Sequence, residues 1–157
     1  MAEFLGTYDP EKVQIQLNFE NVTGFAQGSM VTVTRNEDRT TEHVGTKGEV
    51  SRAINRNNTY TIKFTLQQTS RFNAVLNALS NGDDLLGVPT IIPLRVFDPN
   101  SYEQVFAATC WVKTEPERDW SNEVGTREWT LFAVSVGVTP NEVTSLLGAA
   151  GNAAGIL

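Results

Sequence analysis

The sequence has one cysteine and one histidine, Cys110 and His43, in 157 residues. A single thiol forms no internal disulfide, so the chain fits a reducing compartment. A zinc site needs several His or Cys ligands at suitable spacing, and a Ser-His-Asp set needs an oriented histidine. We therefore interpret His43 as a solvent-facing loop residue. Cys110 alternates with Phe106, Ala108 and Val112 and is expected to be a buried structural thiol.

The chain also lacks a basic excess and a long apolar run. Its formal net charge is -6, its pI is about 4.8, and 19% of its residues are charged. This balance argues against a tight grip on phosphate backbones or anionic membranes, although DNA can still slide past such a surface. No apolar run approaches the roughly 20 residues that span a bilayer. The N-terminus has no basic region followed by an apolar one, so a secretory signal is not expected.

Motifs for catalysis or cofactor binding are missing as well. The segment Gly45-Thr46-Lys47-Gly48 lacks the spacing and the Lys-Ser or Lys-Thr ending of a phosphate-binding loop. The segment Asn81-Gly82-Asp83-Asp84 lacks the ligand series of a calcium loop. No acid, base and nucleophile set can be assembled. We expect no enzyme, no cofactor and no metal site.

What the sequence does contain is a series of β-strand patterns. Val13, Ile15, Leu17 and Phe19 alternate with polar residues, which predicts a half-buried strand. Other runs rich in β-branched and aromatic residues predict strands at Met30–Thr34, Val50–Arg56, Tyr60–Leu66, Ile91–Phe97, Val105–Lys113 and Trp129–Val136. Asn57-Asn58 is expected to form a tight turn, because Asn tolerates a positive φ.

One helix interrupts the strands. Phe72, Val75, Leu76 and Leu79 follow helical spacing on one face. Thr69 or Ser70 is expected to cap the start of this helix, and Gly82 to end it in a left-handed turn. A further short helix is expected at Asn141–Leu147.

The last two predicted strands are apolar on both faces, which is typical of strands covered on both sides. We predict a mainly β fold, a β-sandwich or small barrel with one packed helix. Of Trp111, Trp120 and Trp129, at least two are expected in the core. An exposed tryptophan would alternatively be a stacking platform for a sugar or a base.

A charged segment, Arg35-Asn36-Glu37-Asp38, interrupts the strand pattern after Thr34. Together with the glycine-containing stretch up to Val50 it predicts a long hairpin arm over residues 35–50. A monomer gains little from ordering such an arm, whereas a protein that grips a neighbour gains a great deal.

Several stretches together resemble one family, the tail tube proteins of contractile-tailed bacteriophages, in particular the small family typified by structural proteins of Pseudomonas myophages. The similarity follows the order of the family over nearly the whole chain. The matching segments are Thr7–Pro10, Thr23–Ala26, Arg35–Asp38, Val44–Val50 with Arg52, Leu66–Ser70 with Asn73 and Leu76, Lys113, Pro116, Ser121, and Arg127-Glu128-Trp129.

This resemblance implies a single tail-tube domain over residues 1–157, of the β-barrel type shared with type VI secretion tubes. Within it, residues 1–12 are an N-terminal arm, residues 35–50 the extended hairpin arm, and residues 148–157 a small-residue C-terminal tail. Such subunits form hexameric rings that stack, and the hairpin arm reaches the adjacent ring. The expected contacts between rings are Arg35, Asn36, Glu37, Asp38, Lys47, Glu49 and Arg52.

The resemblance also implies partners: a sheath outside the tube, a tape measure protein and then DNA inside it, and a baseplate and a tail terminator at its ends. Specific DNA binding and membrane contact are not expected. The location would be the virion tail, assembled in the host bacterial cytoplasm. Neutral polar faces suit a DNA conduit, either Gln14, Gln16 and Asn18 or Thr61 and Thr65, because cationic walls would bind phosphates.

Two alternatives stay open. The same subunit properties would serve in the tube protein of a phage-tail-like bacteriocin or secretion particle, so the sequence is also compatible with such a protein. It is also compatible with a monomeric β-sandwich binding module that uses Trp120 to bind carbohydrate.

Overall fold

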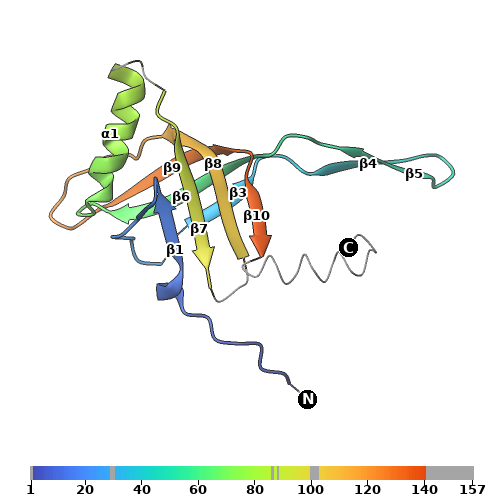
Figure 1. Cartoon of the computed structure of the whole chain (residues 1–157), viewed down its shortest axis with the longest axis horizontal. Helices are drawn as coiled ribbons and strands as arrows, with labels where there is room; N and C mark the ends of the chain where they lie inside the picture. Colours follow the sequence, from blue (N-terminus) through green and yellow to red (C-terminus); the bar gives the residue numbers. More distant parts are fainter. Residues whose placement is uncertain (1, 29–30, 86, 88, 100–102, 141–157) are drawn as a thin grey trace.

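The computed structural model describes residues 2–28, 31–85, 87, 89–99 and 103–140. Over these described residues the fold is mainly β with one α-helix, as predicted (Figure 1). The elements are η1 (Pro10–Lys12), β1 (Gln14–Leu17), β2 (Glu20–Asn21), β3 (Val31–Arg35), β4 (Thr40–Val44), β5 (Val50–Ile54), β6 (Thr59–Gln67), α1 (Phe72–Leu85), β7 (Ile92–Asp98), β8 (Glu103–Thr114), β9 (Thr126–Val134) and β10 (Gly137–Pro140).

Eight strands form one antiparallel sheet in the order β2-β1-β7-β8-β9-β6-β3, with β10 also paired to β8. The sheet curls so that β1, β7 and β8 lie in front of β6, β9 and β3 (Figure 1). The described strands do not close into a barrel, because β2 and β3 are at opposite ends of the strand order. The barrel element of the prediction is therefore not found within one chain.

The core lies on the inner side of this curled sheet. Along β6 the inward side chains Ile62, Phe64 and Leu66 are buried, whereas Lys63 between them is exposed. The register places Phe64 opposite Trp129, which is also fully buried. Each such side chain contributes about 1.5–3 kcal/mol by leaving water, so strict alternation on β6 fixes which face is inward.

The first strand is shorter than predicted. Ile15 and Leu17 are buried, but β1 ends at Leu17 and Phe19 is 79% exposed. Asn18 and Phe19 have positive φ values of 51° and 66°, which turn the chain into β2. The period-2 pattern therefore predicted strand where the chain makes a tight turn. Asparagine often adopts this left-handed backbone conformation, but phenylalanine rarely does.

The helix α1 begins as predicted and ends later. The Ser70 hydroxyl accepts a hydrogen bond from the Phe72 backbone N–H at 3.3 Å and donates one to the Thr23 carbonyl at 2.6 Å. Gly82 is inside α1 and not at a left-handed end, because the helix continues to Leu85. A Cβ at Gly82 would lie 2.8 Å from Thr90 Oγ1, so close packing explains this glycine.

The strands β8 and β9 bury one face in the core and leave the other partly exposed. Trp111 is half-buried on the outer face and stacks on Phe132, with ring centroids 5.2 Å apart. Trp129 is buried and Trp120 is 75% exposed. The expectation of two core tryptophans was therefore wrong by one, because the side chain of Trp111 lies on the far side of the sheet from the core.

The predicted helix at Asn141–Leu147 and the tail at 148–157 lie outside the described residues. Residues 2–9 form no helix or strand and precede η1. In the described part of the chain, no helix is both long enough and apolar enough to cross a membrane.

Candidate assembly interface: the hairpin arm and its base

The strands β4 and β5 form a two-stranded sheet of their own, paired from Thr40↔Ile54 to Val44↔Val50. Figure 1 shows this hairpin projecting away from the main sheet. Apart from the half-buried Thr40, its strand residues are all exposed. This hairpin overlaps the arm predicted over residues 35–50 and extends beyond it, because the returning strand continues to Ile54. An isolated hairpin of this length is at best marginally stable in water.

The tip of the arm is a short turn. The Gly45 N–H donates to the Glu49 carbonyl at 2.7 Å, and the Gly48 N–H donates to the Gly45 carbonyl at 3.0 Å. Gly48 has a φ of 84°, a conformation that favours glycine. Lys47 and Glu49 are exposed at this turn. A strand, β5, and not a helix follows this turn, as expected for a hairpin tip and not for a phosphate-binding loop.

Three aliphatic side chains lie on one face of the hairpin. Val44 and Val50 face each other across the strands and are 69% and 65% exposed, and Ile54 on the same face is 60% exposed. Aliphatic side chains this open on a projecting element gain stability by packing against another surface. Glu42 and Arg52 lie opposite each other on the same face, between the two valines and Ile54, so the arm offers both aliphatic and charged side chains to another chain.

The base of the arm is held by Arg35 at the end of β3. Its guanidinium donates hydrogen bonds to the Asn57 carbonyl at 2.8 Å, to Asn58 Oδ1 at 3.3 Å and to the Glu37 carbonyl at 2.9 Å. It also lies 5.8 Å from the centre of the Tyr60 ring. This one side chain links the strand that leaves the sheet to the segment that returns to it.

Asn36 and Glu37 extend this link. The Asn36 side chain donates to Thr59 Oγ1 at 2.9 Å and accepts from the Thr61 hydroxyl at 2.6 Å. Glu37 Oε2 accepts from Asn55 Nδ2 at 2.7 Å. Hydrogen bonds from Asn55, and then from Asn57, lower the pKa of the Glu37 carboxyl below its ordinary value.

The residues predicted to contact the next ring therefore fall into separate groups. Arg35, Asn36 and Glu37 make hydrogen bonds within the chain at the arm base, with Asp38 beside them. Lys47 and Glu49 are at the tip, and Arg52 is on β5 opposite Glu42. The structure does not bring them together, and their contact with a neighbour stays a prediction.

The sequence reading missed the role of the segment from Asn55 to Asn58. Neither Asn57 nor Asn58 has a positive φ, so the predicted tight turn is wrong. Asn55 Oδ1 accepts from the Asn57 N–H at 2.9 Å, and Asn58 Nδ2 donates to the Val136 carbonyl at 3.0 Å. The signal in the sequence was the presence of three asparagines in four residues. Their side-chain amides both donate and accept hydrogen bonds, and here these bonds brace the arm.

Comparison with known proteins gives the family. The sequence pattern of the Bacteriophage PhiTE tail tube protein family matches residues 14–139, which includes every strand of the sheet except the last residue of β10. The chain belongs to this family of phage tail tube proteins. It is also 29% identical over 138 residues to Structural protein ORF10 of Pseudomonas phage KPP10, covering 83% of this chain and 80% of that protein.

Solved structures share the fold of this tail tube protein. The cap that terminates the tube of the anti-feeding prophage matches with a TM-score of 0.61 and 16% identity, over 89% of this chain and 94% of that one. A chain of the sheath-tube complex of the PVC extracellular contractile injection system matches with a TM-score of 0.54 and 13% identity, over 85% and 92% of the two chains. At these identities the similarity concerns the fold.

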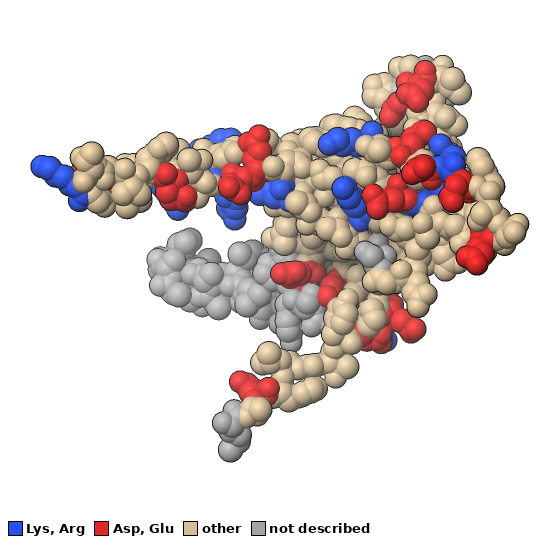
Figure 2. All heavy atoms as spheres, turned by 180° about the vertical axis from the view of Figure 1, so that it is seen from behind, with Lys and Arg blue, Asp and Glu red and all other residues tan. Residues whose placement is uncertain are grey.

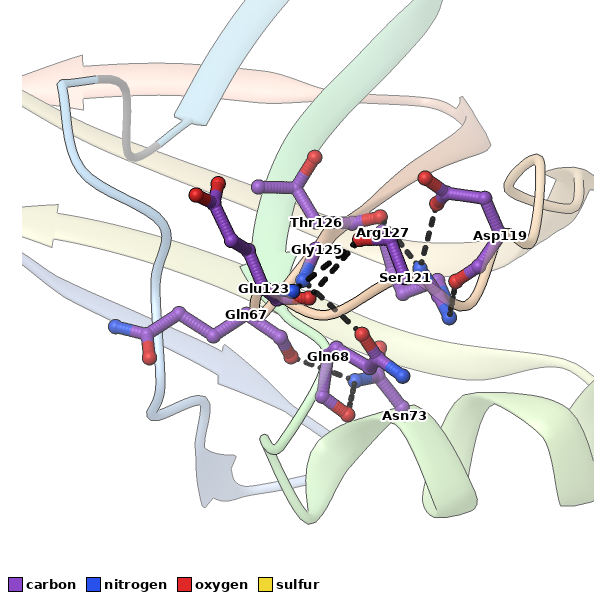
Figure 3. Close-up of polar contacts among 9 residues, drawn as sticks. All are labelled: Gln67, Gln68, Asn73, Asp119, Ser121, Glu123, Gly125, Thr126 and Arg127. Carbon is purple, nitrogen blue, oxygen red and sulfur yellow. Dashed lines mark hydrogen bonds and ion pairs between the residues drawn. The ribbon is translucent and has the colours of Figure 1, made fainter.

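In this tail tube protein, segments that carried the resemblance meet in space (Figure 3). Asn73 donates to the Gln67 carbonyl at 2.8 Å and accepts from Trp129 Nε1 at 2.9 Å. Gln68 Oε1 accepts from the Gly125 N–H at 3.0 Å. The matching stretches at 66–73 and 127–129 thus join the start of α1 to β9 and to the loop before it.

The two residues that sequence reading considered for chemistry lie apart. His43 is exposed on β4, and Cys110 is fully buried in β8. Burial raises the pKa of the Cys110 thiol to about 12, so it is a structural residue, as predicted. The residues that the structure describes contain no cluster of three or more His, Cys, Asp or Glu side chains arranged to hold a metal ion.

Proposed function

We propose that this protein is the repeating subunit of a phage tail tube, in which hexameric rings stack around a channel for DNA ejection. The observation that carries the proposal is the arm. The hairpin projects with no core of its own, exposes aliphatic and charged side chains, and has a braced base, and a subunit needs these features to grip a neighbouring ring.

The open edge of the sheet supports ring closure. β3 is at one end of the strand order and has no strand partner on its outer side among the described residues. Unpaired edges are a liability that is removed when copies of the same sheet join into one continuous barrel. We therefore expect neighbouring subunits to continue this sheet around the channel.

The outer faces of the sheet fit a conduit that does not bind DNA. Gln14 and Gln16 lie on the outer face of β1, Thr61 and Thr65 on that of β6, and Asn18 in the turn after β1. Lys63 shares the β6 face, so that face carries one phosphate-binding side chain among neutral ones. In the proposed assembly a sheath lies outside, a tape measure protein and then DNA lie inside, and a baseplate and terminator close the ends. In this proposal the protein is structural, without catalysis, cofactor or membrane contact. It is located in the virion after assembly in the host cytoplasm.

Deletion of the arm tip tests the proposal. Removing Gly45 to Gly48 is expected to leave the circular dichroism spectrum and the melting temperature unchanged, because no core residue is lost. Stacking is expected to fail, so negative-stain images should show single rings or monomers where the parent chain gives tubes. The variant Thr46→Ser is the matched control that keeps the tip length. Tubes of normal length after the deletion would contradict the role of the arm.

Charge reversal at the arm base gives a second test. Glu37→Lys with Asp38→Lys is expected to reduce the sedimentation coefficient of assembled particles. Glu3→Lys with Glu11→Lys makes the same change of net charge at exposed N-terminal positions and serves as the control. Unchanged sedimentation of the arm-base variant would count against these contacts.

A second candidate is the tube of a phage-tail-like bacteriocin or secretion particle. The fold similarity to parts of the anti-feeding prophage and of the PVC injection system favours it. The subunit would have the same properties in either particle. Capsid and terminase genes beside the gene for this protein would identify the particle as a phage. A monomeric carbohydrate-binding module using the exposed Trp120 would remain a single particle on size exclusion at high concentration.

A further inference from the structure

A cavity of about 510 Å³ lies where the arm joins the sheet, and four arginines line it. They are Arg35, Arg39, Arg52 and Arg56, a third of the 12 Lys and Arg in the chain. A chain with a net charge of -6 therefore gathers much of its positive charge around one hollow. Like charges around a concave surface raise the local potential and attract an anionic group.

Three of these arginines are available for a ligand. Arg35 is engaged in the arm base, as described above. Within the described part of the chain, the side chains of Arg39, Arg52 and Arg56 make no hydrogen bond or ion pair. The cavity also offers the half-buried amides of Asn55 and Asn58. The planar guanidinium group of each arginine presents a fork of N–H donors that matches a carboxylate.

The opposite end of the molecule carries a complementary surface, the loop between β8 and β9 (residues 115–125). Figure 1 shows this loop and the arm at opposite ends. The loop holds four acidic residues and one basic residue: Glu115, Glu117, Asp119, Glu123 and Arg118. Figure 2 shows acidic side chains at the α1 end with some basic ones among them, and basic side chains together with acidic ones around the junction of the arm with the sheet.

Two of the four carboxylates are already occupied. Glu115 accepts from the Ser80 hydroxyl at 2.6 Å and pairs with Arg118 at 3.3 Å. Asp119 lies 3.5 Å from Arg127. The exposed carboxylates of Glu117 and Glu123 have no partner among the described residues. These two are the carboxylates that remain for a contact with another molecule.

The loop is held in place from inside (Figure 3). Arg127, only 5% exposed, donates to the carbonyls of Asp119 at 3.1 Å and Thr126 at 2.9 Å. Gln68 and Gly125 exchange two hydrogen bonds, of 2.9 and 3.0 Å. Trp120 projects from the loop and is 75% exposed. A pre-ordered loop with an exposed aromatic anchor loses little entropy on binding.

We propose that the arginine-lined cavity at the arm base receives the acidic β8–β9 loop of a second copy of this chain, with Glu117 and Glu123 facing Arg39 and Arg56 and Trp120 packing beside them. This inference rests on the proposed function, because it names one contact of the assembly. Cavity and loop are at opposite ends, so each copy presents both halves, and the contact propagates from copy to copy in a ring or a stack.

Reciprocal charge reversal tests the contact. One variant carries Arg39→Glu and Arg56→Glu, the other Glu117→Lys and Glu123→Lys, both in the full chain. Each alone sets like charges against each other, and we expect the critical concentration for assembly to rise at least about tenfold. Mixed one to one, or combined in a single chain, the reversals restore opposite charges, and assembly should return to within about threefold of the parent chain.

Controls separate folding and net charge from the contact. Lys12→Glu with Arg71→Glu matches the charge change of the cavity variant at exposed sites and should assemble like the parent. Circular dichroism checks that each variant folds. If the cavity reversal variant does not fold, Arg39→Gln with Arg56→Gln replaces it. This neutral double variant should raise the critical concentration for assembly by a smaller factor. Assembly of both reversal variants at the parent concentration would overturn the contact, as would a loss that neither mixing nor combination restores.

The outcomes also separate this contact from the proposed function. If the parent chain makes tubes and the reversal variants do too, the tube role stands and the contact fails. If the parent chain makes no assembly under any condition, both fail. A duplex DNA oligonucleotide that binds the parent chain but not the cavity variant, with assembly unchanged, would overturn the protein occupant in favour of a phosphate backbone.

Discussion

The side-chain amide of Asn55 lies 2.7 Å from Glu37 Oε2, and this hydrogen bond joins the outgoing and returning ends of the arm. The Asn55 N–H also donates to the Arg39 carbonyl at 2.8 Å. The arm therefore leaves the sheet through a braced junction, and its direction is set before any neighbour binds. In the proposed assembly, this pre-set direction would lower the entropy cost of stacking.

Removing the brace should loosen the arm without unfolding the sheet. In Asn55→Ala we expect amide hydrogens of β4 and β5 to exchange faster, while those of β6 and β9 exchange as in the parent chain. Hydrogen exchange read by mass spectrometry measures this directly. Asn77→Ala, on α1, is the control. Equal exchange of the arm in parent and variant would show that Asn55 does not brace it.

Acid should loosen the same junction. The pKa of Glu37 is lowered in the folded protein, so its contribution is present above the ordinary value of 4.5 and is lost as pH falls through the folded pKa. We therefore expect exchange of the arm, corrected for intrinsic rates, to rise only below about pH 4.5, and Glu37→Gln to remove this step. A step that persists in Glu37→Gln would assign it to another group.

The hydrogen bond from Trp129 Nε1 to Asn73 Oδ1 should matter for stability. Trp129 is fully buried, so Asn73→Ala leaves its indole N–H without a partner. We expect the free energy of unfolding to fall by about 1–3 kcal/mol in urea titrations. Asn77→Ala, one turn along α1, should change it by about 0.5 kcal/mol or less, since Asn77 only meets Arg118 near the surface. Equal losses of stability in the two variants would contradict a stabilising role for the hydrogen bond between Trp129 and Asn73.

Gly24 is predicted to resist substitution. It has a φ of 82°, and a Cβ there would lie 2.6 Å from Ser70 Cβ, beside the helix cap. Gly24→Ala should therefore destabilise the fold by more than about 1 kcal/mol. Gly28→Ala is the matched control, with a φ of 100° but nothing within 4 Å, and it isolates the backbone cost from the clash. A Gly24 variant no less stable than the Gly28 variant would refute the packing argument.

Cys110 should be inert in the folded protein. Its thiol is fully buried and its pKa is raised to about 12, so almost no thiolate is present near pH 8. We expect no reaction with a thiol reagent until denaturant is added, and one thiol per chain afterwards. Rapid labelling of the native chain would mean that β8 opens far more easily than its position suggests.

Long alternating patterns made much of this fold predictable. β6 follows from its period-2 pattern and β9 from its run of β-branched and aromatic residues, and the start of α1 follows from the Ser70 cap and the buried Phe72 and Leu76. Patterning failed where backbone geometry overrides it, as at Phe19, and where tertiary packing explains a glycine, as at Gly82 beside Thr90. Neither feature has a local sequence signal.

The arm itself was predictable from its charges and glycines, but its base was not. The braces pair residues about 20 positions apart, such as Arg35 with Asn57 and Asn36 with Thr59. Long-range side-chain pairing leaves no periodic trace in a single sequence. For the same reason the gathering of Arg39, Arg52 and Arg56 around one cavity became visible only in three dimensions.

The most direct test of the central claim is a cryo-electron microscopy reconstruction of the concentrated full-length protein. It should show stacked rings in which the sheet of each subunit continues into the next and residues 40–54 of one ring contact the adjacent ring. A monodisperse single particle, with β3 unpaired and the arm extended into solvent at every concentration, would contradict it.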